Sequence, residues 1–152
     1  MVVVIDFDGT CVTNEFPRIG DEIGATPVLK ELVQNDHELV LFTSRNDQNK
    51  WLSYFSNAKN KQNHLTEAIN WFKERDIPLY GIQKHPKQKR WSSSPKAFGD
   101  VIIDYSTLGC PLVYPDANSL SKMPYVDWIE FRAYLVDLGL LNDLTKESVY
   151  HK

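Results

Sequence analysis

Near its start the sequence reads Val2-Val3-Val4-Ile5-Asp6-Phe7-Asp8-Gly9-Thr10, an apolar run that leads directly into two acids. Four β-branched apolar residues in succession favour a strand, and the unbroken run indicates that both faces of this strand are buried. Strands of this kind are typical of parallel sheets that are covered on both sides. The stretch therefore predicts a central strand of an α/β protein.

Asp6 and Asp8 stand where this strand is expected to end. Residues i and i+2 of extended backbone point to the same side, so the two carboxylates converge. Gly9 lets the chain turn sharply after them. Open α/β sheets bind their ligands at the carboxyl ends of the strands, and two acids placed there suit a hard cation and a nucleophile.

Outward from this strand, helical and strand patterns alternate. Thr26-Pro27 predicts an N-cap followed by proline at the first helical position. The other segments expected to be regular are strands at 38–42, 78–82 and 100–104, a short helix within 46–62, a helix capped by Asn63, and a helix over 125–141. This alternation predicts a three-layer α/β, Rossmann-like fold, with a central, mainly parallel sheet and helices on both faces.

Composition and charge are ordinary for one globular domain. The 152 residues include 42% hydrophobic and 24% charged residues, as is typical of soluble proteins. A net charge of −3 and a pI near 5.8 argue against a general nucleic-acid binder. No apolar stretch is long enough to span a bilayer, no signal peptide precedes the first strand, and two cysteines make no disulfide framework. We therefore expect a cytoplasmic, single-domain protein without a membrane partner.

Three of the predicted strands end in polar side chains. Thr43-Ser44-Arg45 follows the second strand and Asp104 ends the fourth, so both should share the sheet edge that carries Asp6 and Asp8. Lys96 lies eight residues before Asp104. Phosphoryl transfer requires a nucleophile, a divalent cation, and fixed cationic and hydrogen-bonding groups. The strand ends supply residues of each kind.

These residues resemble the motifs of the haloacid dehalogenase-like superfamily, in its phosphatase branch. Asp6-Phe7-Asp8-Gly9-Thr10 matches the first motif, Asp-x-Asp-x-Thr. Thr43 matches the second motif, a lone Thr or Ser after an apolar strand, while Lys96 fits the lysine motif and Asp104 the acid of the fourth. The resemblance covers a motif-bearing core over about residues 1–110, and a C-terminal loop and helix over 111–152 complete the single domain.

The resemblance implies a magnesium-dependent phosphomonoester hydrolase that works through an aspartyl-phosphate. Asp6 would be the nucleophile, and Asp8 the general acid for the leaving oxygen and then the base for the attacking water. Thr43 and Lys96 would hold the phosphoryl group. The residues implied to hold Mg²⁺ are Asp6, Asp8 through its backbone carbonyl, and Asp104. Further substrate contacts are expected from Gly9, Thr10, Ser44 and Arg45.

Three residues depart from the pattern of the family or offer an alternative to it. The fourth motif of the family usually has two acids close together, whereas Tyr105 follows Asp104 here. Asp100 has the spacing of one family variant, yet it opens the apolar run and is expected at the far end of its strand. Lys84 also follows a predicted strand and is an alternative to Lys96 as the motif lysine.

The intervals between the motifs leave no room for a full cap domain. Between Asp8 and Thr43 lie 34 residues, and between Arg45 and Lys96 lie 50, which the predicted elements already use. A capless member has an open site, shielded by loops, by the 111–124 segment or by a second subunit of a homo-oligomer. The substrate would be a phosphorylated small molecule or a nucleic-acid end. Two other functions stay open, a catalytically weak or silent module that binds a phosphorylated ligand or a protein, and a phosphotransferase.

One segment has a strong local charge. Between Ile77 and Gly99 there is no Asp or Glu, while five Lys or Arg residues and Trp91 occur there. The segment carries +5, so the remainder of the chain carries −8. A solvated loop is the simplest interpretation, and guidance of a polyanion is the alternative.

Overall fold

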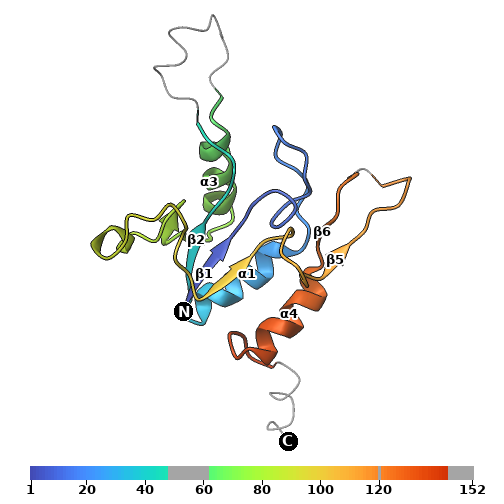
Figure 1. The fold of residues 1–152 in the computed structure, drawn as a ribbon. Coiled ribbons are helices and arrows are strands. Elements are labelled where there is room, and N and C mark those ends of the chain that lie inside the picture. The colour runs from blue at the N-terminus through green and yellow to red at the C-terminus, as the bar shows by residue number, and fades with distance from the viewer. Residues whose placement is uncertain (48–61, 120, 144–152) are drawn as a thin grey trace, which may run out of the picture.

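The computed structural model describes residues 1–47, 62–119 and 121–143. Four strands form one sheet in the order β3-β2-β1-β4, and every neighbouring pair is parallel (Figure 1). The strands are β1 (Val2–Ile5), β2 (Glu38–Leu41), β3 (Gly81–Ile82) and β4 (Val101–Ile103). Helices α1 (Ala25–Gln34) and α3 (His64–Glu74) lie between successive strands in the sequence. This arrangement confirms the α/β, Rossmann-like fold with a parallel sheet.

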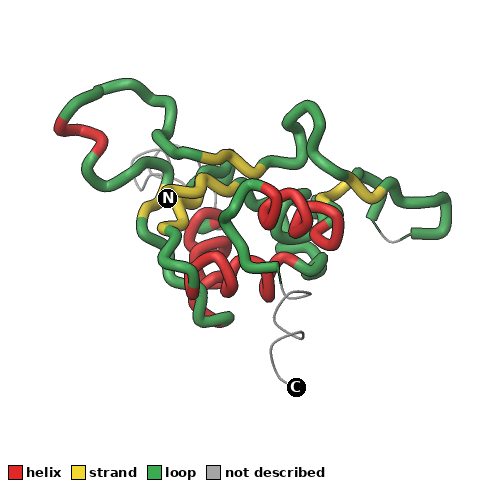
Figure 2. The backbone as a smooth tube through the Cα atoms, turned by 90° about the horizontal axis from the view of Figure 1, so that it is seen from below, coloured by secondary structure: helices red, strands yellow, loops and turns green. Residues whose placement is uncertain are grey.

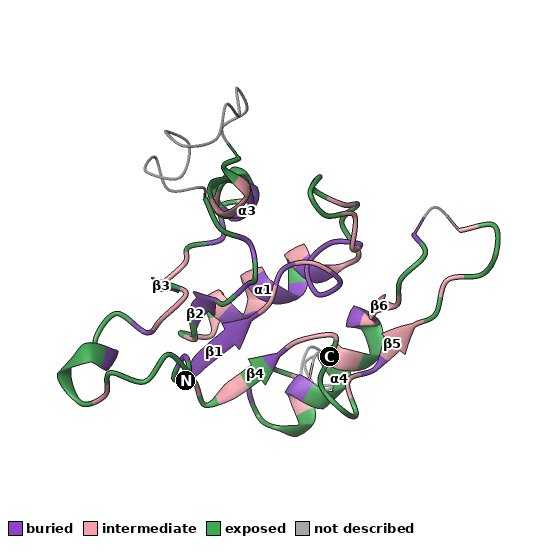
Figure 3. Cartoon of the chain, turned by 45° about the horizontal axis from the view of Figure 1, so that its top comes forward, coloured by how far each residue is buried: buried purple, intermediate pink, exposed green. Residues whose placement is uncertain are grey.

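β1 lies inside the sheet, between β2 and β4, as its apolar run predicts. Its register pairs Val4 with Val40 of β2 and with Ile102 of β4. All four residues of β1 are buried (Figure 3). Beyond the strand, the Asp6 N–H donates to the carbonyl of Ile103 (3.0 Å). The buried strand thus delivers Asp6 to the carboxyl edge of the sheet.

The described α-helices pack against one face of the sheet (Figure 2). Val3 and Ile5 of β1 point into the core on this face, because alternate residues of a strand share a side. The core is completed by helix residues such as Leu29 of α1, Phe72 of α3, and Leu135 of α4 (Trp128–Asp137).

The opposite face of the sheet is covered by irregular chain. Val2, Val4 and Val40 form a small buried cluster with Ala97, and Tyr80 packs against it. Within the described residues, the layer on this face is the segment between β3 and β4, which is the loop that the sequence predicts there, whereas helices were expected on both faces of the sheet. The sheet is therefore less deeply covered on this side.

α1 begins earlier than predicted, at Ala25, with Gly24 as the N-cap. Gly24 has a φ of 96°, a left-handed conformation that glycine adopts without steric cost. Thr26 is not the cap, because it lies inside the first turn. The carboxylate of Glu22 instead accepts hydrogen bonds from the N–H groups of Gly24 (2.9 Å) and Thr26 (2.7 Å). A carboxylate at this end also suits the helix dipole.

The helix predicted over 125–141 starts later and ends earlier. Residues Tyr125–Val126 form β6, which pairs antiparallel with β5 (Leu112–Val113) in the region expected to be irregular. α4 then starts at Trp128, where the Asp127 side chain accepts from two N–H groups of the first turn. Aspartate is a strong N-cap residue, and it ends the strand pairing at this point.

The remaining elements follow the predicted order. The strands expected at 78–82 and 100–104 have two and three residues, and Asn63 is the N-cap of α3 as predicted. The short helix expected within 46–62 falls almost entirely outside the described residues. Among the helices of the described part of the chain, none has the length and apolar character that crossing a membrane requires.

Candidate active site

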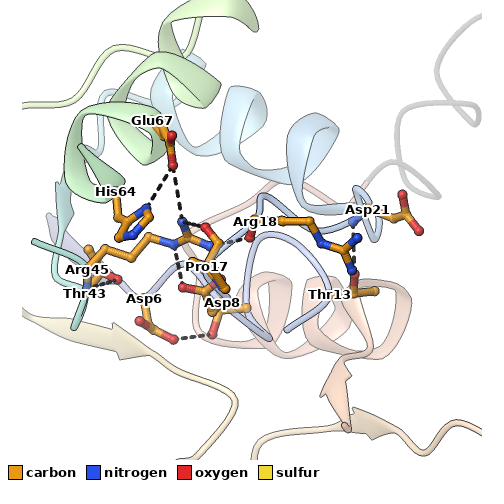
Figure 4. Close-up of polar contacts among 11 residues, drawn as sticks. Asp6, Asp8, Thr13, Pro17, Arg18, Asp21, Thr43, Arg45, His64 and Glu67 are labelled. Carbon is orange, nitrogen blue, oxygen red and sulfur yellow. Dashed lines mark hydrogen bonds and ion pairs between the residues drawn. The ribbon is translucent and has the colours of Figure 1, made fainter. Parts of the chain in front are cut away.

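The ends of three neighbouring strands bring the predicted acids and a hydroxyl group to one sheet edge. Asp6 follows β1, Thr43 follows β2 and Asp104 follows β4, and β1 lies between the other two strands. Figure 4 shows Asp6, Asp8 and Thr43 gathered at this edge. Residues that are about 40 to 100 positions apart thereby become neighbours, as the parallel topology requires.

Asp6 is a half-buried carboxylate with an altered protonation equilibrium. Its pKa is raised from 3.8 to about 7, mainly by burial and in part by the negative charges of Asp104 and Asp8. Hydrogen bonds from the Phe7 N–H and from the Thr10 hydroxyl (3.2 Å) oppose this shift. A carboxyl group perturbed in this way, at a strand end beside other acids, is typical of functional sites.

Thr10 connects the first motif with the end of β4. Its buried hydroxyl donates to Asp6 and accepts from the Tyr105 N–H (3.0 Å). Gly9 has a φ of 77°, and the Tyr105 ring lies so close that an added Cβ would be 2.8 Å from Cδ1. Tyr105, which stands where the family that the sequence resembles usually has an acid, therefore packs on the motif loop. Gly9 and Thr10, both predicted substrate contacts, have structural partners within this loop.

Residues of the C-terminal region hold the same loop from another side. The Val126 N–H donates to the Gly9 carbonyl (2.9 Å), and the indole of Trp128 donates to the Thr10 carbonyl (2.7 Å). Trp128 is buried. The motif-bearing core over residues 1–110 is thus completed by residues 126–128, which sequence analysis did not assign to the site.

Arg45 binds the carboxylate of Asp8 in a bidentate salt bridge. Its Nε donates to Oδ2 (2.7 Å) and its Nη2 to Oδ1 (2.6 Å). The side chain of Arg45 is 1% exposed and that of Asp8 is 16% exposed. The planar guanidinium matches a carboxylate in this two-point geometry. Arg45, a predicted substrate contact, is instead committed to Asp8, so it positions that carboxylate.

The other donors of Arg45 hold the loop that follows the first motif. Nη1 donates to the carbonyl of Pro17 (3.1 Å), and Nη2 also donates to the carbonyl of Arg18 (2.7 Å). Glu67 of α3 lies 4.0 Å from Nη1. Figure 4 shows Arg45 between Asp8 and Glu67, with the two loop carbonyls beside it. This loop is therefore fixed next to Asp8.

Gln83 fixes the backbone around Thr43, and sequence analysis did not identify it. Its side-chain oxygen accepts from the Thr43 N–H (3.0 Å), and its nitrogen donates to the carbonyls of Thr43 (2.7 Å) and Arg45 (3.2 Å). A glutamine after a predicted strand carries no distinctive signal. The Thr43 hydroxyl accepts from the Arg45 N–H (3.2 Å). Thr43 is buried whereas Ser44 is exposed, so Ser44 is the more accessible hydroxyl here.

Asp104 has the position that its motif predicts, with a local partner in Ser106. The N–H and the hydroxyl of Ser106 both donate to Oδ1 of Asp104 (2.8 and 2.7 Å). Asp100 accepts from the Val2 N–H (2.7 Å) at the opposite end of the sheet. Asp100 therefore lies outside the site, as its place before the apolar run predicts.

The motif lysine is the least defined part of the site. Within the described residues, no hydrogen bond or ion pair joins the side chain of Lys96 or Lys84 to the three acids. Lys96 is exposed, and its carbonyl accepts from Gln88 (2.6 Å). Lys84 is half-buried and directly follows Gln83, the residue that holds the backbone of Thr43. On position, Lys84 is the stronger candidate, and the role of Lys96 stays a prediction.

The acids at the sheet edge suit a hard divalent cation. Mg²⁺ typically takes one or two carboxylates and keeps several waters, and Asp6 and Asp104 offer such oxygens. A cation would relieve the repulsion that contributes to the raised pKa of Asp6. The Asp8 carboxylate faces Arg45, which leaves its backbone carbonyl for the metal. Among the residues that the structure describes, no group of three or more His, Cys, Asp or Glu is arranged as a metal centre, so the cation belongs to the proposal below.

A large cavity lies away from this edge. It has a volume of about 980 Å³ between α1 and α4, and its lining includes Val28, Trp128 and Ile129. None of the predicted site residues lines it. We place the candidate active site at the strand ends because the interacting acids lie there.

Comparisons with known proteins support the fold. No family model matches the sequence, and no curated protein matches it. Among solved structures, a conserved protein coded by a locus from Bacteroides thetaiotaomicron is similar, with a TM-score of 0.61 and 26% sequence identity. The match covers 100% of this chain and 98% of that chain.

Proposed function

We propose that the protein is a magnesium-dependent phosphomonoester hydrolase that forms an aspartyl-phosphate on Asp6. The observation that carries the proposal is the meeting of three acids at the ends of adjacent parallel strands. Asp6 has a raised pKa there, Asp104 lies beside it, and Asp8 is held by Arg45. Phosphoryl transfer depends on positioned groups of this kind.

Two carboxylates divide the chemistry. Asp6 attacks the phosphorus, so that an acyl-phosphate bond forms while the bond to the leaving oxygen breaks. Asp8 gives a proton to that oxygen and then takes one from the water that hydrolyses the intermediate. Mg²⁺ on Asp6, Asp104 and the Asp8 carbonyl would neutralise charge on the phosphoryl oxygens.

Arg45 acts on this chemistry through Asp8. Both carboxylate oxygens of Asp8 accept from the guanidinium, which fixes the group at a defined distance from Asp6. Proton transfer depends on the position of the group that carries the proton, and one of the two bonds to Arg45 must open before that Asp8 oxygen can take a proton. Thr43 and Ser44 follow the neighbouring strand, and their hydroxyl groups would contact the phosphoryl oxygens, because the Thr43 N–H already donates to Gln83.

Phosphate release from an aryl phosphate tests the proposal. The wild-type protein should release phosphate with Mg²⁺ and lose this activity in EDTA. Asp6→Asn removes the nucleophile with little change in shape, so the rate should fall by at least about 10³-fold. Asp137→Asn, on an exposed position of α4, is the matched control and should keep the wild-type rate. Metal-independent hydrolysis, or an active Asp6→Asn variant, contradicts the proposal.

A binding module without turnover is the second candidate, and two observations favour it. The Tyr105 ring packs on Gly9 where the family usually has an acid, and Arg45 occupies both oxygens of Asp8. Calorimetric titration with phenyl phosphate and Mg²⁺ distinguishes the two functions. Saturable binding without phosphate release would support the module and contradict the enzyme.

A further inference from the structure

Residues 83–98, here called the basic loop, concentrate positive charge on one part of the surface. The loop runs from β3 toward β4 and contains no Asp or Glu. Its cations are Lys84, Lys87, Lys89, Arg90 and Lys96. In the part of the chain that the structure describes, none of the five forms an ion pair. Lys84 is half-buried, and the other four are exposed, so their charge is directed at solvent and at ligands that bind from solvent.

Aromatic rings gather within and beside the basic loop. The His85 ring lies between others, with centroids 5.3 Å from Tyr80 and 5.4 Å from Trp91. Phe98 lies 5.7 Å from both His85 and Trp91. Trp91 is 55% exposed and Phe98 is 44% exposed. The loop thus presents flat apolar surface to solvent among its cations. Figure 3 colours much of the chain between β3 and β4 as exposed.

A buried glutamine gives the basic loop a fixed shape. Gln88 is 2% exposed and begins a short 3-10 turn, Gln88–Arg90. Its side-chain nitrogen donates to the carbonyls of Ser94 (3.1 Å) and Lys96 (2.6 Å), and its oxygen accepts from the Phe98 N–H (2.9 Å). Rings held in place lose less conformational freedom when a ligand binds. The exposed rings therefore form a surface whose shape is fixed before a ligand binds.

The basic loop begins at the candidate active site and covers the second face of the sheet. Its first residue, Gln83, holds the backbone of Thr43, and Ala97 packs on the cluster around Val4. Ile102 pairs with Val4, so it faces the same side, and it is 46% exposed. Apolar surface of the sheet therefore stays exposed at Ile102 on the face that the basic loop partly covers.

The exposed rings lie away from the strand ends that carry Asp6. His85 packs on Tyr80, which precedes β3, so the ring cluster is near the amino ends of the strands. From Val2 to Asp6 the strand backbone spans about 13 Å at ~3.3 Å per residue. A small phosphate ester bound at Asp6 cannot reach the rings, whereas a chain of several nucleotides can.

We propose that the substrate is the terminal phosphate of a single-stranded nucleic acid, and that the basic loop binds the strand behind that terminus. This inference rests on the proposed hydrolase and names its substrate class. Exposed aromatic faces stack on bases whatever the sequence, and lysine and arginine neutralise the backbone phosphates. Bases in a duplex are already stacked on each other, so the rings select a single strand.

The distribution of charge over the chain supports binding of the nucleic-acid strand at the basic loop. The segment that contains the basic loop carries +5 while the remainder carries −8. The acidic remainder repels a polyanion, which is therefore steered to the basic loop. A pI near 5.8 is thus compatible with a nucleic-acid substrate, because the binding charge is local.

Strand binding is tested without turnover, using the Asp6→Asn protein and a fluorescent, 3′-phosphorylated single strand of about 12 nucleotides. Anisotropy should show salt-dependent binding that Trp91→Ala weakens about tenfold or more and Trp91→Phe restores. The triple variant Lys87→Gln/Lys89→Gln/Arg90→Gln should lower the slope of log K against log salt by about 2. Lys73→Gln, at an exposed position of α3 outside the basic loop, is the control and should bind like the parent protein. Undetectable binding, or binding that Trp91→Ala leaves unchanged, overturns the inference.

Turnover is measured next in the active protein. Trp91→Ala should lower kcat/KM for the phosphorylated strand about tenfold and leave kcat/KM for an aryl phosphate unchanged. Hydrolysis of aryl phosphate without loop-dependent turnover of the strand overturns this inference and leaves the hydrolase standing. Loop-dependent strand binding with no hydrolysis of any phosphate overturns the hydrolase, and with it the substrate assignment.

Discussion

Arg45 and Asp8 form a bidentate salt bridge, with donor–acceptor distances of 2.7 and 2.6 Å, inside a site where the arginine is almost fully buried. The same guanidinium holds the carbonyls of Pro17 and Arg18. One side chain therefore fixes both the candidate acid–base residue and the loop beside it. Its removal should affect catalysis and stability together.

Arg45→Lys tests this coupling. Lysine keeps the charge but cannot reproduce the planar fork, so Asp8 and the loop should lose their common anchor. We expect kcat to fall about 100-fold and the free energy of unfolding to fall by about 2 kcal/mol. Steady-state kinetics and urea denaturation measure the two effects. Arg90→Lys, an exposed arginine without an ion pair in the described residues, is the control, and equal behaviour of the two variants would contradict the assigned role.

The raised pKa of Asp6 predicts how the metal-free protein responds to pH. Between about pH 4 and pH 7 the folded state keeps a proton on Asp6 that the unfolded state has lost. The folded state then binds more protons, so its stability falls as the pH rises through this window. With the pKa of Asp6 raised to about 7, the free energy of unfolding should fall by about 2–4 kcal/mol across this window.

Asp6→Asn should remove this pH dependence, because the amide does not ionise. The variant and the wild type should have similar stability near pH 4, and the variant should be more stable by about 2 kcal/mol near pH 8. Urea unfolding in EDTA at both pH values gives the comparison. A stability difference that does not change with pH would refute the assigned shift.

Gln83→Leu tests the support of Thr43. The substitution removes three hydrogen bonds to the backbone of Thr43 and Arg45, which should cost about 2 kcal/mol. Because the strand end proposed to bind the phosphoryl group is displaced, kcat/KM should fall even under conditions in which the variant is fully folded. Gln34→Leu, exposed at the end of α1, should change neither quantity. Full activity in Gln83→Leu would show that Thr43 needs no such support.

Gly9 and Tyr105 should be energetically coupled. Gly9→Ala places a Cβ 2.8 Å from the Tyr105 ring at a φ of 77°, and we expect a loss of about 2–3 kcal/mol. Tyr105→Ala removes the clash, so the double variant should be more stable than the sum of the single effects allows. A double-mutant cycle by urea denaturation measures the coupling. Additive effects would mean that the backbone conformation alone requires glycine.

The sequence predicts those parts of the molecule that depend on neighbouring residues. The apolar run of β1 and the spacing of Asp6 and Asp8 identify a buried strand and its reactive end, because both are local patterns. The parallel order of the sheet then brings Asp104 to the same edge. The N-cap at Gly24 was missed because its helix is capped by a carboxylate from Glu22, two residues earlier.

The contacts that complete the site depend on tertiary structure, and no local pattern announces them. Arginine after a strand is a residue type expected to bind phosphate, and only the fold shows that the Arg45 side chain turns inward and binds Asp8. Gln83 and Trp128 reach the site from distant segments, Gln83 through both ends of its amide and Trp128 through its indole N–H. A glutamine or a tryptophan on the surface would have no role in a site, so the residue type alone does not predict that either one supports the site.

The bond from the Trp128 indole to the Thr10 carbonyl joins residues 118 positions apart. A ribosome adds residues from the N-terminus onward, so the first motif is the earliest part of the site to be synthesised. Its loop acquires this hydrogen bond, and the one from Val126 to Gly9, only after nearly all of the described chain has emerged. The nascent protein therefore carries the proposed nucleophile, Asp6, long before the loop around it is fully supported, and the candidate site is completed when α4 docks.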